Sequence, residues 1–153
     1  MNNLIKNFVE EFNKIEEPIR IISHLDADGL TSSAIISKTL TRENKEFNLS
    51  IIRQLDEDTI KELSLENYNC FLFVDLGSGF LDLINKHLND RKVFILDHHV
   101  PENVETSFVH VNPHLIGFDS DSISGAGLAY LFAKELNKNN KDLAYISIIG
   151  SAG

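Results

Sequence analysis

Apolar residues along this chain form two kinds of pattern that alternate from one end to the other. Short, mostly apolar runs of strand length occupy residues 20–23, 49–55, 71–74, 92–96 and 108–111. Amphipathic patterns with a period of about 3.6 residues occupy residues 3–16, 29–41, 56–63, 80–88, 122–136 and 143–149. Strands that alternate with helices predict an α/β fold. We therefore expect a doubly wound, five-stranded, mostly parallel sheet with helices on both faces.

Length and composition fit one globular domain. The chain has 153 residues, of which 42% are hydrophobic, and no apolar run reaches the length of a membrane span. The N-terminus lacks a signal-peptide pattern, and the lone Cys70 excludes an internal disulfide, so we expect a cytoplasmic protein without a membrane partner. The net charge of −9 is unusual for a nucleic-acid-binding surface, so any polyanionic substrate must be bound locally, through metal ions or by another domain.

Acidic and histidine side chains follow three of the predicted strands, at the point where each strand ends. We call these residues the strand-end cluster: His24, Asp26 and Asp28; Asp75; Asp97, His98 and His99. Taken singly, each residue is as easily explained as a turn, a helix cap or a surface histidine. Because the carboxyl ends of parallel strands meet at one edge of the sheet, their joint occurrence at three strand ends favours a shared site.

The chemistry of the strand-end cluster points to divalent cations. Carboxylates held close together repel one another unless a positive charge lies between them. Carboxylate oxygens and imidazole nitrogens, without thiolate, suit Mn²⁺ or Mg²⁺, with Zn²⁺ or Co²⁺ as alternatives. A carboxylate on the middle strand is placed to bridge two ions, and such a pair is the usual machinery of phosphoryl displacement.

The motifs and their order resemble the DHH phosphoesterase superfamily. The resemblance rests on His24-Leu-Asp26-Ala-Asp28-Gly29, on Val74-Asp75 after an apolar strand, and on Asp97-His98-His99. It extends from about residue 20 to the end of the chain. The first motif most resembles the RecJ-like branch, particularly the archaeal RecJ-type single-strand exonucleases.

The resemblance implies a role for each residue. Asp26 and His24 would bind one metal ion, Asp28 and His98 would bind a second, and Asp75 would bridge the two. Asp97 would orient its neighbours, and His99 would contact the scissile phosphate. Ser124 and Gly125, at a helix start, resemble a substrate-binding segment of the family, although Ser124 is equally well explained as a helix cap. Two Mn²⁺ or Mg²⁺ ions are expected in the complete protein.

One departure from the family pattern concerns its fourth motif, an aspartate that completes the second metal site. Residues 148–153 look like the lead-in to that motif, and Asp119 and Asp121 lie in a different context, as turn and cap residues. We therefore expect residues 1–153 to be a DHH catalytic domain that stops before the fourth motif and lacks the C-terminal DHH-associated domain. By itself, such a fragment is expected to bind metal weakly and to turn over poorly.

The resemblance implies a metal-dependent phosphodiesterase that acts on single-stranded DNA or RNA by a two-metal mechanism, with replication or repair proteins as partners. Three alternatives stay open. The first is a phosphodiesterase of short oligonucleotides or dinucleotides, and the second is a pyrophosphatase. The third is a scaffold of the replication machinery without catalysis. Three further histidines are expected to be structural: His87 on a solvated helix face, His110 and His114.

Overall fold

The sheet is built from five strands that all run parallel. The computed structural model describes residues 1–152, and its strands lie in the order β2-β1-β3-β4-β5. Their bounds are β1 Ile19–His24, β2 Phe47–Ile52, β3 Cys70–Val74, β4 Lys92–Leu96 and β5 Val109–Val111. The predicted α/β class is confirmed, and the sheet is wholly rather than mostly parallel.

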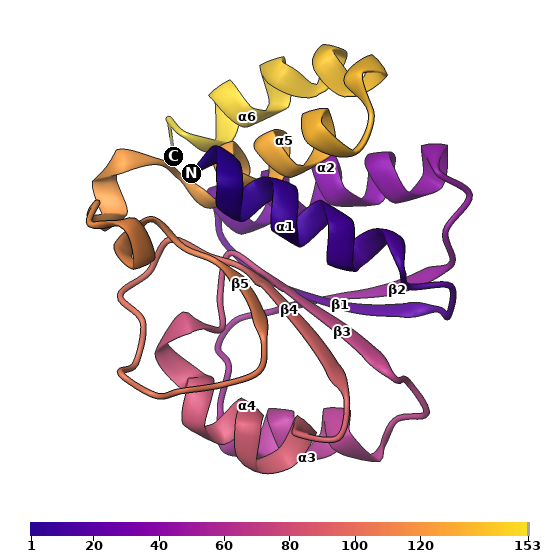
Figure 1. The fold of residues 1–153 in the computed structure, drawn as a ribbon, viewed down its shortest axis with the longest axis vertical. Helices are drawn as coiled ribbons and strands as arrows, with labels where there is room; N and C mark the ends of the chain where they lie inside the picture. The colour runs from indigo at the N-terminus through magenta and orange to yellow at the C-terminus, as the bar shows by residue number, and fades with distance from the viewer. Residues whose placement is uncertain (153) are drawn as a thin grey trace.

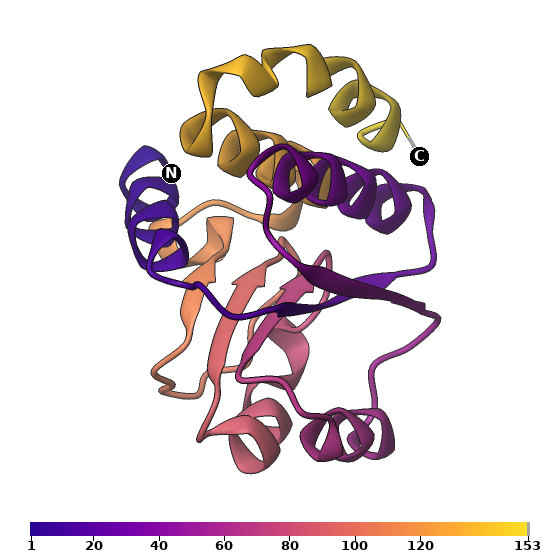
Figure 2. The ribbon, with the colours of Figure 1, turned by 90° about the vertical axis from the view of Figure 1, so that its right-hand side faces the viewer.

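Six α-helices of the described residues cover the two faces of this sheet. Their bounds are α1 Asn2–Asn13, α2 Ala27–Arg42, α3 Glu57–Leu65, α4 Leu81–Leu88, α5 Gly125–Leu136 and α6 Ala144–Gly150. Figure 1 shows α1, α2, α5 and α6 on one side of the sheet and α3 and α4 on the other. The view from the side in Figure 2 shows the same layers, with α6 stacked outside α2 and α5.

Each face of the sheet buries its own hydrophobic core, as expected for central parallel strands. On the α1 side, an aromatic cluster of Phe8, Phe12, Phe94 and Phe132 packs with ring centroids 5.1–6.2 Å apart. On the other side, α3 and α4 bury apolar side chains against β3 and β4, among them Ile60, Ile84, Phe71, Phe73 and Ile95. β3 is buried along its whole length, and its packing holds the backbone position of Asp75, the residue that follows it.

Two expectations from the sequence need correction. β2 spans Phe47–Ile52 rather than 49–55, because Leu55 leaves the ladder and is buried in the core on the α3 side. His87 is not solvated: its Nε2 lies 3.0 Å from Glu57 Oε1, and only 16% of its side chain is exposed. The salt bridge between α3 and α4 explains the difference, since it joins residues 30 positions apart.

Candidate metal centre

The carboxyl ends of β1, β3 and β4 bring the strand-end cluster together. His24 is the last residue of β1, Asp75 directly follows β3, and Asp97 directly follows β4. The backbone amide of Asp75 donates to Leu96 O at 2.8 Å, so the strand ladder extends one residue beyond β3. The predicted meeting of these residues at one sheet edge is confirmed.

Asp75 lies at the centre of the site. Its φ of +59° is in the left-handed region, where aspartate and asparagine are among the few tolerated non-glycine residues. Its side chain is 1% exposed, and neither carboxylate oxygen has a hydrogen-bond partner. A buried carboxylate without hydrogen bonds is costly, so this group is suited to bind a cation.

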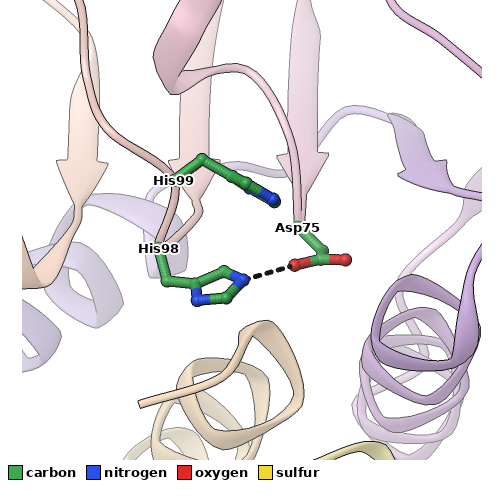
Figure 3. Close-up of side chains that lie close together, drawn as sticks. All are labelled: Asp75, His98 and His99. Carbon is green, nitrogen blue, oxygen red and sulfur yellow. Dashed lines mark ion pairs between the residues drawn. The ribbon is translucent and has the colours of Figure 1, made fainter. Parts of the chain in front are cut away.

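Two groups of potential ligand atoms share Asp75. His24, Asp26 and Asp75 offer atoms within 4.8 Å of one another, and so do Asp75, His98 and His99. Figure 3 shows both histidine rings directed toward the Asp75 carboxylate. The donor set of carboxylates and imidazoles fits Mn²⁺ or Mg²⁺ on either side of Asp75.

The charges around Asp75 shift the proton equilibria of the site. Burial raises the pKa of Asp75 to about 6, and the neighbouring Asp28, Asp97 and Asp26 add to this against the attraction of His98. The ion pair with Asp75 raises the pKa of His98 to about 9. The site therefore attracts a cation strongly, and in this state the His98 imidazolium partly fills that role.

Asp26 and His24 are held by the start of α2. Asp26 caps this helix, because its Oδ1 accepts a hydrogen bond of 2.7 Å from the amide of Gly29. Its Oδ2 lies 2.6 Å from His24 Nδ1, while His24 Nε2 donates to Arg53 O at 3.2 Å. Burial raises the pKa of Asp26, but the hydrogen bond from Gly29 and the charge of His24 outweigh it and hold the pKa below its usual value.

The side chain of Asp28 points at the start of α5. Its two carboxylate oxygens accept hydrogen bonds of 2.7 Å from the amides of Gly125 and Ala126. Its Oδ2 also lies 3.5 Å from His98 Nε2, so Asp28 borders the second group of ligand atoms without belonging to it. Asp28 is thus near the predicted position of a second ion, and the helix N-terminus is its partner in this structure.

Asp97 organises the segment after β4. Its Oδ1 accepts from the amide of His98 at 2.8 Å and lies 2.7 Å from His99 Nδ1, and its Oδ2 accepts from the amide of Ser78 at 2.9 Å. Burial raises the pKa of Asp97, but His99 and the amide of Ser78 outweigh it and lower the pKa to about 2. Asp97 therefore holds the His99 ring and the backbone of this segment by hydrogen bonds.

The two histidines after Asp97 have different surroundings. His98 Nδ1 donates to the carbonyl of Ser120 at 2.9 Å, which leaves Nε2 to face Asp75. Such a bond on the second nitrogen is typical of metal-binding histidines. The hydrogen bond with Asp97 raises the pKa of His99, whose side chain is 52% exposed. His99 Nε2 is thus free to meet a ligand from solvent.

At the start of α5, Ser124 caps the helix, because its Oγ accepts from the amide of Gly127 at 3.1 Å. Of the two interpretations of Ser124, helix capping is the one observed. Gly125 contacts the site directly: a Cβ atom at this position would overlap the Asp75 carboxylate. Glycine here allows α5 to approach the metal centre closely.

Comparison with known proteins decides the family. A model of the DHH family, N-terminal domain, matches residues 18–151. The chain belongs to the DHH family. The predicted resemblance is confirmed.

This DHH domain has relatives that include exonucleases. A protein of Methanocaldococcus jannaschii, itself uncharacterized, is 38% identical over 143 residues, which cover 88% of this chain and 32% of that protein. The single-stranded-DNA-specific exonuclease RecJ of Thermus thermophilus is 29% identical over 137 residues, which cover 85% of this chain and 20% of RecJ. The DHH domain described here thus spans a third or less of the length of these curated relatives.

Solved structures share the fold of this DHH domain. An exonuclease RecJ bound to manganese superimposes with a TM-score of 0.82 at 23% identity, covering 97% of this chain and 42% of that chain. CDC45 from Entamoeba histolytica gives a TM-score of 0.65 at 16% identity, covering 97% of this chain and 31% of that chain. No helix among residues 1–152 combines the length and the apolar character needed to cross a membrane.

Sequence reasoning missed several residues that support the DHH motifs. Ser120 holds His98, and Ser78 and Asn112 contact the segment after β4. Ser78 stands between two glycines, and Asn112 precedes Pro113 at the end of β5, so both stand out locally as turn residues. His110 and His114 were expected to be structural, and they bond Ser78 Oγ at 2.8 Å and Ser120 Oγ at 2.9 Å, respectively.

Proposed function

We propose that this DHH domain is the catalytic domain of a metal-dependent phosphodiesterase that hydrolyses single-stranded nucleic acid with two Mn²⁺ or Mg²⁺ ions. The observation that carries the proposal is the buried, unpartnered carboxylate of Asp75, which is shared by two groups of ligand atoms. A carboxylate that bridges two cations must lie between two sets of ligands, as Asp75 does. The exonuclease names of the RecJ relatives support the substrate class.

In this proposal the ligands divide on either side of Asp75. His24 and Asp26 would hold the first ion, His98 and Asp28 would hold the second, and Asp75 would contribute to both sites. The ions would supply Lewis acidity at the scissile phosphate and lower the pKa of an attacking water. They would also neutralise the aspartates of the strand-end cluster, which by themselves repel a phosphodiester.

His99 is proposed to bind the phosphate itself. Its Nδ1 is held by Asp97, and that bond raises its pKa, so its exposed Nε2 carries a proton over a wider pH range. A half-exposed cationic N–H beside the metal centre is suited to donate to a phosphate oxygen and to stabilise charge that develops there. Asp97 is proposed to orient the His99 ring. It accepts three hydrogen bonds from the backbone amides of Ser78, His98 and His99 and is paired with His99 Nδ1.

A cavity of about 240 Å³ lies beside these groups and supports a role in binding part of the substrate. It is lined by His24, Asp75 and His99, and by the apolar side chains of Leu55, Leu76 and Phe80. A lining with both polar and apolar side chains suits a nucleotide better than inorganic pyrophosphate, which has no apolar part. This observation favours a nucleic-acid substrate over the pyrophosphatase alternative.

Hydrolysis assays with four substrates test the proposal. The chain is incubated with MnCl₂ or with EDTA and with a single-stranded DNA, a single-stranded RNA, a dinucleotide or pyrophosphate, and products are identified by mass spectrometry. We expect Mn²⁺-dependent release of nucleotides from a single strand and a loss of at least 100-fold in His99→Ala. We expect wild-type rates in His87→Ala, because His87 on α4 pairs with Glu57 on α3 and neither residue lines the cavity or belongs to the ligand groups.

The other outcomes separate the alternatives. Cleavage restricted to dinucleotides, or to pyrophosphate, would replace the proposed substrate by a smaller one. Because slow turnover is expected of this chain, the assays are also run with the chain in excess over substrate. Mn²⁺ binding without hydrolysis of any of the four substrates under these conditions would contradict the catalytic proposal and favour a scaffold.

A further inference from the structure

A buried network of polar side chains links the ends of β3, β4 and β5 next to the metal centre. We call Ser78, His110 and Asn112 the positioning network. Ser78 and Asn112 are fully buried, and Ser78 Oγ lies 2.8 Å from His110 Nε2 and 2.9 Å from Asn112 Nδ2. Asn112 Nδ2 also donates to the carbonyl of His99 at 2.8 Å. Ser78 lies 32 and 34 positions before His110 and Asn112, so the fold brings the two segments together.

The direction of each hydrogen bond in this network follows from the chemistry of the groups. Asn112 Oδ1 accepts from the amide of His114 at 2.9 Å, which fixes the orientation of the side-chain amide. The two hydrogens of Nδ2 are then directed to Ser78 Oγ and to the carbonyl of His99. Because Ser78 Oγ accepts from Asn112, its own proton is free to be donated to His110 Nε2. His110 completes the chain as an acceptor.

His110 is suited to accept that proton at neutral pH. Burial lowers its pKa to about 4, so the ring is neutral and Nε2 keeps its lone pair. The hydroxyl of Ser78 and the side-chain amide of Asn112 therefore have partners for their polar atoms. Fully satisfied buried networks of this kind make the local structure rigid.

The network is attached to the Asp97-His98-His99 segment at two points. The amide of Ser78 donates to Asp97 Oδ2 at 2.9 Å, and Asn112 holds the carbonyl of His99. Asp97 in turn accepts from the amides of both histidines, at 2.8 Å and 3.3 Å. Movement of Ser78 or Asn112 would shift the backbone that aims His98 and His99 at Asp75.

We propose that Ser78, Asn112 and His110 are positioning residues that hold the Asp97-His98-His99 segment in its metal-binding geometry. They touch neither the ligand atoms nor a substrate, and act through the backbone of that segment. The proposal rests on the proposed function in so far as His98 and His99 serve the metal centre. Changes to residues that support metal ligands typically weaken metal binding about 10- to 100-fold.

The test measures Mn²⁺ affinity by calorimetry on the wild-type chain and on Ser78→Ala, Asn112→Ala and the double variant. Ser32→Ala is the matched control, because Ser32 is also fully buried but its hydroxyl has no hydrogen-bond partner. All measurements are made under solution conditions in which circular dichroism shows that each variant is folded. If Asn112→Ala does not fold, Ser78→Ala, which removes one oxygen atom, carries the test.

We expect Mn²⁺ affinity to fall about 10- to 100-fold in Ser78→Ala and in Asn112→Ala, and to stay within about twofold of wild type in the control. The double variant should lose less than the product of the two single losses, because both act through one network. Wild-type affinity in folded Ser78→Ala and Asn112→Ala would overturn the proposal while leaving the proposed function intact.

Hydrogen exchange of single amides separates failure of this proposal from failure of the proposed function. The amides of His98 and His99 should exchange at least about tenfold faster in Ser78→Ala than in the control, whereas the β3 amides should be unaffected. This result would support the network even if the wild-type chain bound no Mn²⁺ and the proposed function failed. Unchanged exchange at His98 and His99 would overturn the network whatever the metal result.

Discussion

Asp75→Asn is expected to stabilise the metal-free protein. The substitution removes a buried negative charge that has no hydrogen-bond partner and that lies among Asp26, Asp28 and Asp97. Asparagine tolerates the left-handed backbone conformation at this position as well as aspartate does, so no new strain is introduced. The change therefore isolates the cost of the charge.

The magnitude follows from the pKa of Asp75. In the folded protein this pKa is about 6, against an ordinary value of 3.8, and the difference corresponds to about 3 kcal/mol. Because the folded-state pKa is raised, the penalty is absent below about pH 4, grows between about pH 4 and 6, and is complete above about pH 6. Loss of the ion pair with His98 offsets part of the gain, so about 3 kcal/mol is the upper limit at pH 8.

Asp97→Asn provides the matched control, since Asp97 is equally buried but well hydrogen-bonded. Its pKa is lowered to about 2, which corresponds to about 2 kcal/mol of stability. This contribution is present above about pH 4 and is lost as pH falls through 2. Asp97→Asn should therefore destabilise the protein at pH 8, the opposite of Asp75→Asn.

Urea denaturation at pH 4 and pH 8, in EDTA and in saturating MnCl₂, measures both variants. In EDTA we expect Asp75→Asn to exceed wild type at pH 8 and to equal it at pH 4. A ligand at 100 times its Kd stabilises the folded state by about 3 kcal/mol, so Mn²⁺ should stabilise wild type and leave Asp75→Asn unchanged. An Asp75→Asn protein that is less stable than wild type at pH 8 in EDTA would refute the reasoning.

Three further predictions address the site and its scaffold. Gly125→Ala should weaken Mn²⁺ binding at least tenfold by calorimetry, because its Cβ would overlap Asp75, whereas Gly79→Ala, which meets no close neighbour, should bind as wild type. Mn²⁺ affinity should fall by up to about tenfold per pH unit as pH is lowered from 8.5 to 6.5, because the ion displaces the proton from His98, whose pKa is raised to about 9. Calorimetry at several pH values measures this dependence, and an affinity that does not change with pH would contradict it. Phe132→Ala, in the aromatic cluster, should lower the free energy of unfolding, measured by urea denaturation, by about 3–5 kcal/mol. A loss below about 1 kcal/mol would show that packing of this cluster contributes little to stability.

Much of the fold could be predicted from the sequence because the apolar patterns are local. The strand over 92–96 and the end of the helix at Leu136 are found where the pattern places them. β2 was misplaced because Leu55 is apolar for a different reason, namely burial in the core beyond the strand. Hydrophobic periodicity identifies a buried side chain without showing which element buries it.

Prediction of the site was limited by contacts that form across the fold. The meeting of His24, Asp75 and His98 follows from strand order, and the sequence indicated it. The hydrogen bonds from the α5 amides to Asp28 join residues about 100 positions apart, and no local sequence pattern predicts them. The same is true of the bond from Asn112 to His99, which becomes visible only when β4 and β5 lie side by side.

The measurement that tests the central claim most directly is calorimetric titration of Mn²⁺ into the wild-type chain and into Asp75→Asn. If Asp75 is the carboxylate shared by the two groups of ligand atoms, wild type should bind Mn²⁺ and the variant should lose binding in full. Equal Mn²⁺ binding by both proteins would contradict a metal centre built on Asp75.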